Sequence, residues 1–115
     1  HNLYGPTEAS VGVSHELSTK DGLTKGVVVP IGKPFSYVKF RIFRTDKYDG
    51  KDTIEAGDLV DVADGEIGEL FIGGDCLAKG YIKNPEKTKA AFFSFPDVCP
   101  PPPLAASPFS LYKTG

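Results

Sequence analysis

Residues 2–8 read Asn-Leu-Tyr-Gly-Pro-Thr-Glu and place an aromatic ring, a hydroxyl and a carboxylate close together in the chain. Gly5 permits unusual backbone dihedrals and Pro6 fixes its own, so we expect a sharp turn between Tyr4 and Thr7. An aromatic face can stack on a purine, a hydroxyl can donate to a phosphate oxygen, and the Glu8 carboxylate can bind Mg²⁺. The segment indicates a nucleotide-binding corner, with an ordinary loop that carries a chance Tyr and Glu as the alternative.

The composition describes one small globular unit. The chain has 115 residues, 40% hydrophobic and 11% aromatic, with a net charge of −2. This balance gives no electrostatic indication of nucleic acid or of an anionic membrane surface, and no apolar run reaches membrane-spanning length. We therefore expect a cytoplasmic protein with neither kind of partner. Because the sequence contains no methionine, we expect it to be an internal piece of a longer protein.

Glycine and proline make up a fifth of the chain, with 13 and 10 residues. This share exceeds the usual value of about 12% and predicts many turns, short strands and little helix. Strands are expected at residues 27–29, 37–44, 59–62 and 69–72. In the second of these, Val38, Phe40 and Ile42 fall on one face. Cys76 and Cys99 are expected to be reduced thiols rather than a disulfide.

One helix has a well-marked start. Asn84 suits the N-cap, Pro85 suits the first helical position, and Glu86 favours the positive end of the helix dipole. The helix should reach about residue 93, because Pro96 blocks its continuation. Four prolines at 100–103 then predict a stiff connecting loop, which we prefer to a proline-rich recognition ligand.

Acidic residues recur at every third position between residues 46 and 64. Calcium binding is one interpretation, but the sequence fails the EF-hand template, because Thr45 and Lys47 stand where acids are needed. A solvated acidic loop or a pair of edge strands is the preferred interpretation. The seven acids are Asp46, Asp49, Asp52, Glu55, Asp58, Asp61 and Asp64.

Four segments, in the correct order, resemble core motifs of the adenylation domains of nonribosomal peptide synthetases, which belong to the adenylate-forming (AMP-binding) superfamily. Residues 2–8 resemble the fifth motif, 29–35 the Pro-Ile-Gly segment after it, 68–92 the sixth, and 111–115 the seventh up to the residue before its Asp. The Gly-Pro-Thr-Glu form favours amino-acid activation. Two features depart from the family: the stretch 46–66 is long, and the proline run before Leu111 is atypical.

The resemblance implies a β-rich α+β fold: the small distorted β-barrel subdomain of a large N-terminal domain, with one helix near 85–93. The chain then divides into an ATP- and substrate-site loop, barrel strands that carry the acidic loop, a helix, a Pro-rich loop and a truncated seventh motif. These parts are expected at 1–12, 27–83 (acidic loop about 46–66), 84–93, 94–110 and 111–115.

The resemblance also implies an activity. An amino acid is activated with ATP and Mg²⁺ as aminoacyl-AMP and passes to the phosphopantetheine of a peptidyl carrier domain on another part of the assembly. ATP binding is implied for Asn2, Tyr4, Gly5 and Thr7, catalytic roles for Thr7 and Glu8, and Mg²⁺ binding for Glu8. Leu3, Val11 and Gly12 match positions that line the substrate pocket.

Other family parts would lie outside the chain: a phosphate loop before residue 1, and a ribose-binding Asp and a catalytic Lys after residue 115. We therefore expect the isolated piece to be inactive. Gly73, Gly74, Gly80 and Tyr81 are expected to shape a barrel turn rather than contact ATP.

Two other classes of function remain open. The first is an aryl-acid, acyl-CoA or aminoadipate-type activating enzyme. The second is a non-enzymatic β-domain that binds calcium through its acids or a protein partner through its prolines.

Overall fold

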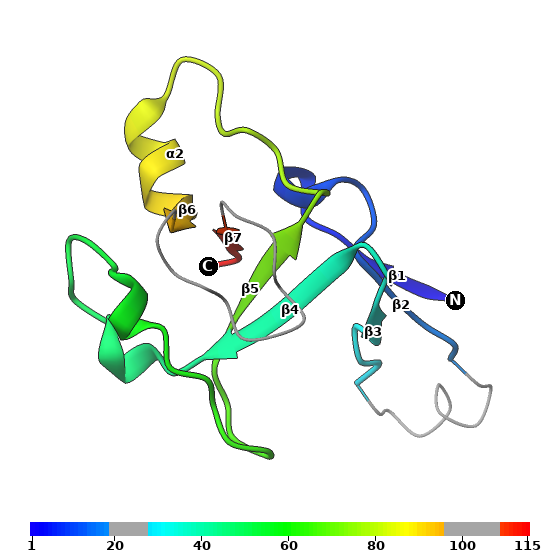
Figure 1. Cartoon of the computed structure of the whole chain (residues 1–115). Coiled ribbons are helices and arrows are strands. Elements are labelled where there is room, and N and C mark those ends of the chain that lie inside the picture. Colours follow the sequence, from blue (N-terminus) through cyan, green and yellow to red (C-terminus); the bar gives the residue numbers. More distant parts are fainter. Residues whose placement is uncertain (19–27, 96–108) are drawn as a thin grey trace.

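The strands of the molecule form two antiparallel sheets (Figure 1). The computed structural model describes residues 1–18, 28–95 and 109–115. The first sheet has the order β1 (Asn2–Tyr4), β2 (Ser14–Glu16) and β3 (Lys33–Pro34). The second has the order β4 (Val38–Phe43), β5 (Glu69–Gly74), β7 (Phe109–Lys113) and β6 (Phe92–Phe95). The predicted β-rich fold is confirmed, although across the described ranges the sheets are open and form no closed barrel.

The two clearest predicted strands are present as β4 and β5, which pair from Val38↔Gly74 to Phe43↔Glu69. The strand expected at 59–62 is reduced to a single bridge between Phe43 and Asp61. Two backbone hydrogen bonds still hold that segment along the edge of β4, from the Arg44 amide to Val60 (2.8 Å) and from the Val62 amide to Ile42 (3.1 Å).

The strand expected at 27–29 is not seen in its described part. Val28 and Val29 lie in no strand, and Val27 falls outside the described residues.

Both faces of the second sheet carry buried side chains. Because successive residues of a strand point to opposite faces, Phe71 and Ile72 of β5 belong to different apolar clusters, as do Leu111 and Tyr112 of β7. The first cluster contains Ala9, Val13, Val38, Ile72, Cys76 and Tyr112. The second contains Phe43, Tyr48, Phe71 and Leu111.

The shared face predicted for Val38, Phe40 and Ile42 is present in the regular strand β4. Burial along it is uneven: Val38 and Phe40 join the first cluster, but Ile42 is 43% exposed, whereas Phe43 on the opposite face is only 1% exposed. The reason is non-local: the stretch that carries η2 (Thr45–Lys47) and η3 (Ala56–Asp58) covers that face. The acidic stretch is thus more than a solvated loop, because it supplies Tyr48, Ile54 and Leu59 to the second core.

The acids of this stretch engage nearby cations and backbone. Ion pairs join Arg41 to Asp61, Arg44 to Asp46 and Lys51 to Asp58. Glu55 and Asp58 form a capping box around η3. Ion pairs at a protein surface are screened by solvent, so they are weak evidence for stability. Within the described ranges, no three His, Cys, Asp or Glu side chains form a group able to hold a metal ion.

The helix α2 (Pro85–Ala91) begins as predicted, since the Asn84 side chain accepts a hydrogen bond from the Lys87 amide at 3.0 Å. It ends at Ala91, two residues early, because Phe92 and Phe93 enter β6 and pair with β7.

Cys76 is a free, buried thiol. Cys99 and the proline run fall outside the described residues. Of the helices described, none is long and apolar enough to span a bilayer.

The Asn84 cap should stabilise this part of the fold measurably. We expect Asn84→Ala to lower the free energy of unfolding by about 1 kcal/mol, because the Lys87 amide loses its partner. Lys89→Ala, an exposed change on the same helix, should stay within about 0.5 kcal/mol. Urea unfolding of the full-length protein followed by circular dichroism measures both, and equal effects would contradict a specific cap.

Candidate functional site

The segment 2–8 comprises β1 and the first part of the loop that joins β1 to β2. The Val13 amide donates to the Tyr4 carbonyl at 2.8 Å and closes the loop at its base. A Cβ at Gly5 would lie 2.6 Å from the Val11 carbonyl oxygen, so only glycine fits there. Pro6 then leads into the short 3₁₀ turn η1 (Thr7–Ala9). The sharp turn predicted at Gly5 and Pro6 lies slightly later in the chain: Pro6 is extended (φ −69°, ψ 153°), and the backbone turns in η1.

The loop is fastened to the segment that follows β5. The Ala78 amide donates to the Glu8 carbonyl at 2.7 Å, and the Ser10 hydroxyl donates to the Cys76 carbonyl at 3.1 Å. Ser10 has φ = 66°, a conformation that side-chain-bearing residues rarely adopt and that the surrounding structure must enforce. Ala9 is fully buried in the first cluster. The backbone around Glu8 is thus fixed from both sides.

The Glu8 carboxylate has a partner far away in the sequence. The Tyr81 hydroxyl donates to its Oε1 atom at 2.6 Å. This bond is the main cause that lowers the pKa of Glu8 below its ordinary value, followed by a backbone hydrogen bond and by smaller contributions from Tyr112 and Lys87. The same bond raises the pKa of Tyr81. Glu8 is therefore an ionised carboxylate held by a neutral phenol.

The side chains expected to bind ATP lie on or beside this loop. Tyr4 is half-buried against the first apolar cluster, and burial raises its pKa. The Asn2 amide nitrogen donates to the Pro30 carbonyl at 2.9 Å, which leaves the side-chain oxygen as the acceptor. Thr7 is exposed at the start of η1. These groups offer an aromatic surface, an acceptor, a hydroxyl and a carboxylate.

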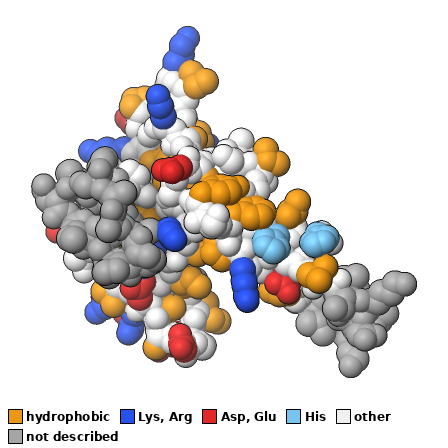
Figure 2. Space-filling model, turned by 45° about the vertical axis from the view of Figure 1, so that its right-hand side comes forward, with side chains coloured by type: hydrophobic (Ala, Val, Ile, Leu, Met, Phe, Trp, Pro, Cys, Tyr) orange, Lys and Arg blue, Asp and Glu red, His pale blue; other side chains and the backbone are white. Residues whose placement is uncertain are grey.

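Two of the expected substrate-pocket residues lie along one aromatic face of the first sheet. Leu3 is directly opposite His15 on the neighbouring strand, so the two side chains share a face. His15 stacks on Phe35 at 5.3 Å, and Phe35 stacks on Tyr37 at 5.8 Å. The Tyr37 hydroxyl donates to the Gly12 carbonyl at 3.4 Å. Figure 2 shows histidine and hydrophobic side chains gathered on this part of the surface.

The described residues leave that face open. Leu3 is 64% exposed and Val11 is 94% exposed. Leu3 also lies on the side of β1 opposite to Tyr4, because the side chains of a strand alternate. The structure therefore brings Gly5 next to Gly12 but does not enclose Leu3 and Val11 in a pocket.

The hydrogen bond between Tyr81 and Glu8 was not predicted from the sequence. Gly74, at the end of β5, and Gly80 have φ values of 113° and 138°, conformations that favour glycine. Tyr81 adds a hydrogen bond to Glu8. No sequence signal joined the two, because their separation of 73 residues exceeds any local spacing rule.

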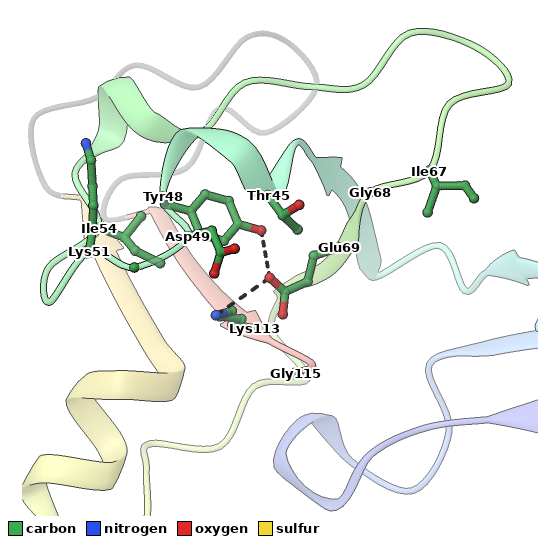
Figure 3. Close-up of a pocket in the computed structure, with 11 residues that line it drawn as sticks. Thr45, Tyr48, Asp49, Lys51, Ile54, Ile67, Gly68, Glu69, Lys113 and Gly115 are labelled. Atoms are coloured by element: carbon green, nitrogen blue, oxygen red, sulfur yellow. Dashed lines mark hydrogen bonds and ion pairs between the residues drawn. The ribbon is translucent and has the colours of Figure 1, made fainter.

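A second polar cluster lies on the other face of the second sheet, in a cavity of about 510 Å³ (Figure 3). The Tyr48 hydroxyl donates to Glu69 Oε2 at 2.7 Å, and Lys113 Nζ lies 3.6 Å from the same oxygen. The Lys113 ammonium also lies 5.3 Å from the centre of the Tyr48 ring. The carboxylate is thus neutralised within its own cluster, which suits a structural role.

Known proteins share both the sequence and the fold of this chain. The sequence profile of the family described as AMP-binding enzyme matches residues 1–82. A D-alanine–D-alanyl carrier protein ligase of Streptococcus pyogenes serotype M5 is 38% identical over 94 residues, which cover 82% of this chain and 16% of the ligase. The chain therefore spans about one sixth of the length of such relatives.

Solved structures agree with this match. Holo-AB3403, a four-domain nonribosomal peptide synthetase bound to AMP and glycine, gives a TM-score of 0.68 at 31% identity, over 99% of this chain and 7% of that protein. The N-terminal subdomain of Klebsiella oxytoca NpsA gives 0.66 at 27% identity, over 98% of this chain and 24% of that one.

The close approach at Gly5 makes a direct prediction. We expect Gly5→Ala to lower the free energy of unfolding by about 1–3 kcal/mol, because the new methyl group meets backbone atoms that cannot move aside. Gly57→Ala is the matched control, since a Cβ there meets nothing within 4 Å and the change should be neutral or slightly stabilising. Thermal and urea unfolding measure both. An unchanged Gly5→Ala protein would show that the loop does not fold back in this way.

Proposed function

The chain belongs to the AMP-binding enzyme family, and from this membership we propose that the full-length protein activates an amino acid with ATP. In the proposed reaction the substrate carboxylate attacks the α-phosphorus of ATP. The bond between the α-phosphorus and the bridging oxygen of the leaving group breaks, pyrophosphate departs, and aminoacyl-AMP forms. The acyl group then passes to the phosphopantetheine thiol of a carrier domain, which releases AMP.

One observation carries the proposal: the Tyr81 hydroxyl holds an ionised Glu8 carboxylate on the loop that also carries the exposed Thr7 and follows Tyr4 of β1. Mg²⁺ in nucleotide sites is usually held by one or two carboxylates together with substrate phosphates, so a single carboxylate fits this pattern. An ionised carboxylate offers about four acceptor positions, and the Tyr81 hydrogen bond occupies one of them. Bound Mg²⁺ would neutralise phosphate charge as pyrophosphate leaves.

The remaining residues would position the nucleotide. The partly exposed Tyr4 ring offers a surface for adenine, and the free acceptor of Asn2 suits the adenine amino group. The Thr7 hydroxyl is exposed and can donate to the α-phosphate. Gly5 lets the backbone turn closely enough to keep these groups together. Such a reaction depends on alignment and charge neutralisation more than on covalent help from the protein.

We propose that the acid is a small amino acid and that Leu3, Val11 and Gly12 form part of its pocket wall. The names of two relatives support this: a D-alanine carrier protein ligase and a synthetase bound to AMP and glycine. The same relatives support carrier loading as the second step. An aryl acid is the second candidate, because the NpsA subdomain is also known in complex with 3-hydroxyanthranilyl-AMSN and gives a TM-score of 0.61 at 26% identity.

Pyrophosphate exchange into ATP by the full-length protein tests the reaction and ranks the acids. D-alanine, L-alanine, glycine and 3-hydroxyanthranilate form the panel. We expect exchange that depends on an amino acid. Exchange only with 3-hydroxyanthranilate would favour the aryl-acid candidate, and no exchange with any acid would count against activation itself.

Two substitutions test the assigned residues. Glu8→Gln should lower exchange by at least about 100-fold, because the metal loses its charged ligand. Tyr4→Ala should weaken ATP binding by about 5- to 150-fold, the loss expected for one base–aromatic stack. Glu86→Gln, an exposed acid on α2, is the matched control and should leave both values unchanged. Full activity in Glu8→Gln would remove Glu8 from the site.

A further inference from the structure

Glu8 is held by a second residue that is itself fixed in place. The Tyr81 amide donates to the Thr88 hydroxyl oxygen at 2.8 Å. Gly80, with φ = 138°, lets the chain pass so close to Thr88 that a Cβ would lie 2.4 Å from its methyl group. The helix α2, which carries Thr88, therefore sets the backbone position of Tyr81.

The ring of Tyr81 is fixed as well. It meets Phe92 edge-to-face, with ring centres 5.8 Å apart, and Lys87 Nζ lies 4.4 Å from its centre. With the ring in this position, its hydroxyl donates to Glu8 Oε1, 2.6 Å away. Groups that face the same carboxylate from β7 and α2 are Tyr112 and Lys87.

The other end of the Glu8 residue is anchored by the same segment. Its carbonyl accepts the Ala78 amide at 2.7 Å, three residues before Tyr81. The segment 76–81 thus forms hydrogen bonds with both the backbone and the side chain of Glu8. A glutamate side chain on a surface loop normally samples many rotamers, and ordering it costs conformational entropy each time a ligand binds.

We infer that Tyr81 is a positioning residue that holds the Glu8 carboxylate in the orientation that receives the metal–nucleotide. The inference rests on the proposed function, because Glu8 is the metal ligand there. Tyr81 contacts neither metal nor nucleotide in this assignment. Its hydrogen bond to Oε1 restricts the carboxylate in advance, so the metal meets an ordered ligand.

The chain contains a matched control. Tyr48 also donates a phenol hydrogen bond to a glutamate, at 2.7 Å to Glu69, but on the other face of the second sheet. Both tyrosines can be changed to phenylalanine, which removes one hydroxyl and keeps the ring. Because Phe preserves the contacts with Phe92 and Lys87, we expect Tyr81→Phe to fold, and thermal unfolding monitors this.

The test measures metal binding rather than turnover. Mn²⁺ binding to the full-length protein with α,β-methylene ATP is followed by electron paramagnetic resonance, and analogue binding is also measured without metal. Tyr81→Phe should weaken Mn²⁺ by about 10-fold and leave metal-free analogue binding unchanged. Tyr48→Phe should change neither value. Unchanged Mn²⁺ affinity in Tyr81→Phe, or equal weakening in Tyr48→Phe, would overturn the inference.

A double variant separates positioning from a general structural effect. In a Glu8→Gln background, Tyr81→Phe should cause no further loss of Mn²⁺ affinity, whereas additive losses would show that Tyr81 acts elsewhere.

The proposed function and the positioning role of Tyr81 are contradicted by different results. A wild-type protein that binds no analogue and no Mn²⁺ defeats the proposed function. A wild-type protein whose Mn²⁺ binding depends on Glu8 but not on Tyr81 defeats only the inference.

Discussion

The docking of the loop 7–10 onto the segment 76–81 is the constraint on which the rest of the structure depends. The strands of the first sheet are only two or three residues long, which is too short for a sheet that must be stable alone. The sheet is ordered because Ala9 and Val13 are buried in the core of the second sheet. The polar contacts of Glu8 and Ser10 then fix where the loop sits on that core.

The site is consequently supported by residues that take no part in its chemistry. The Asn84 cap begins α2, α2 presents Thr88, Thr88 holds the Tyr81 amide, and Tyr81 reaches Glu8. On the opposite face of the second sheet, the acidic stretch 46–64 packs over Phe43 and Phe71. The sheet is therefore packed from both sides, and β5 leads directly into the segment 76–81 that holds Glu8.

Features that depend on neighbouring residues could be read from the sequence. The need for glycine at Gly5, the cap at Asn84 and the alternation in β4 and β5 are all encoded within a few positions. Features that depend on residues distant in the chain could not be predicted from the sequence. The early end of α2 follows from the pairing of Phe92 with Tyr112 in β7.

The burial of Phe43 in place of Ile42 has the same kind of origin, since it follows from the cover that the segment 45–59 provides. The candidate site follows the same rule. The motif at residues 2–8 predicted which side chains could bind a nucleotide, but only the fold shows that Tyr81 is the partner of Glu8.

The two tyrosine–glutamate pairs show why that partner matters. Glu69 receives a phenol and also the Lys113 ammonium, so its charge is balanced inside the cluster. Among the ion pairs of the described ranges none involves Glu8, and the nearby Lys87 ammonium lies over the Tyr81 ring. A neutral phenol orders Glu8 without pairing its charge directly, so the carboxylate keeps acceptor positions for a divalent cation.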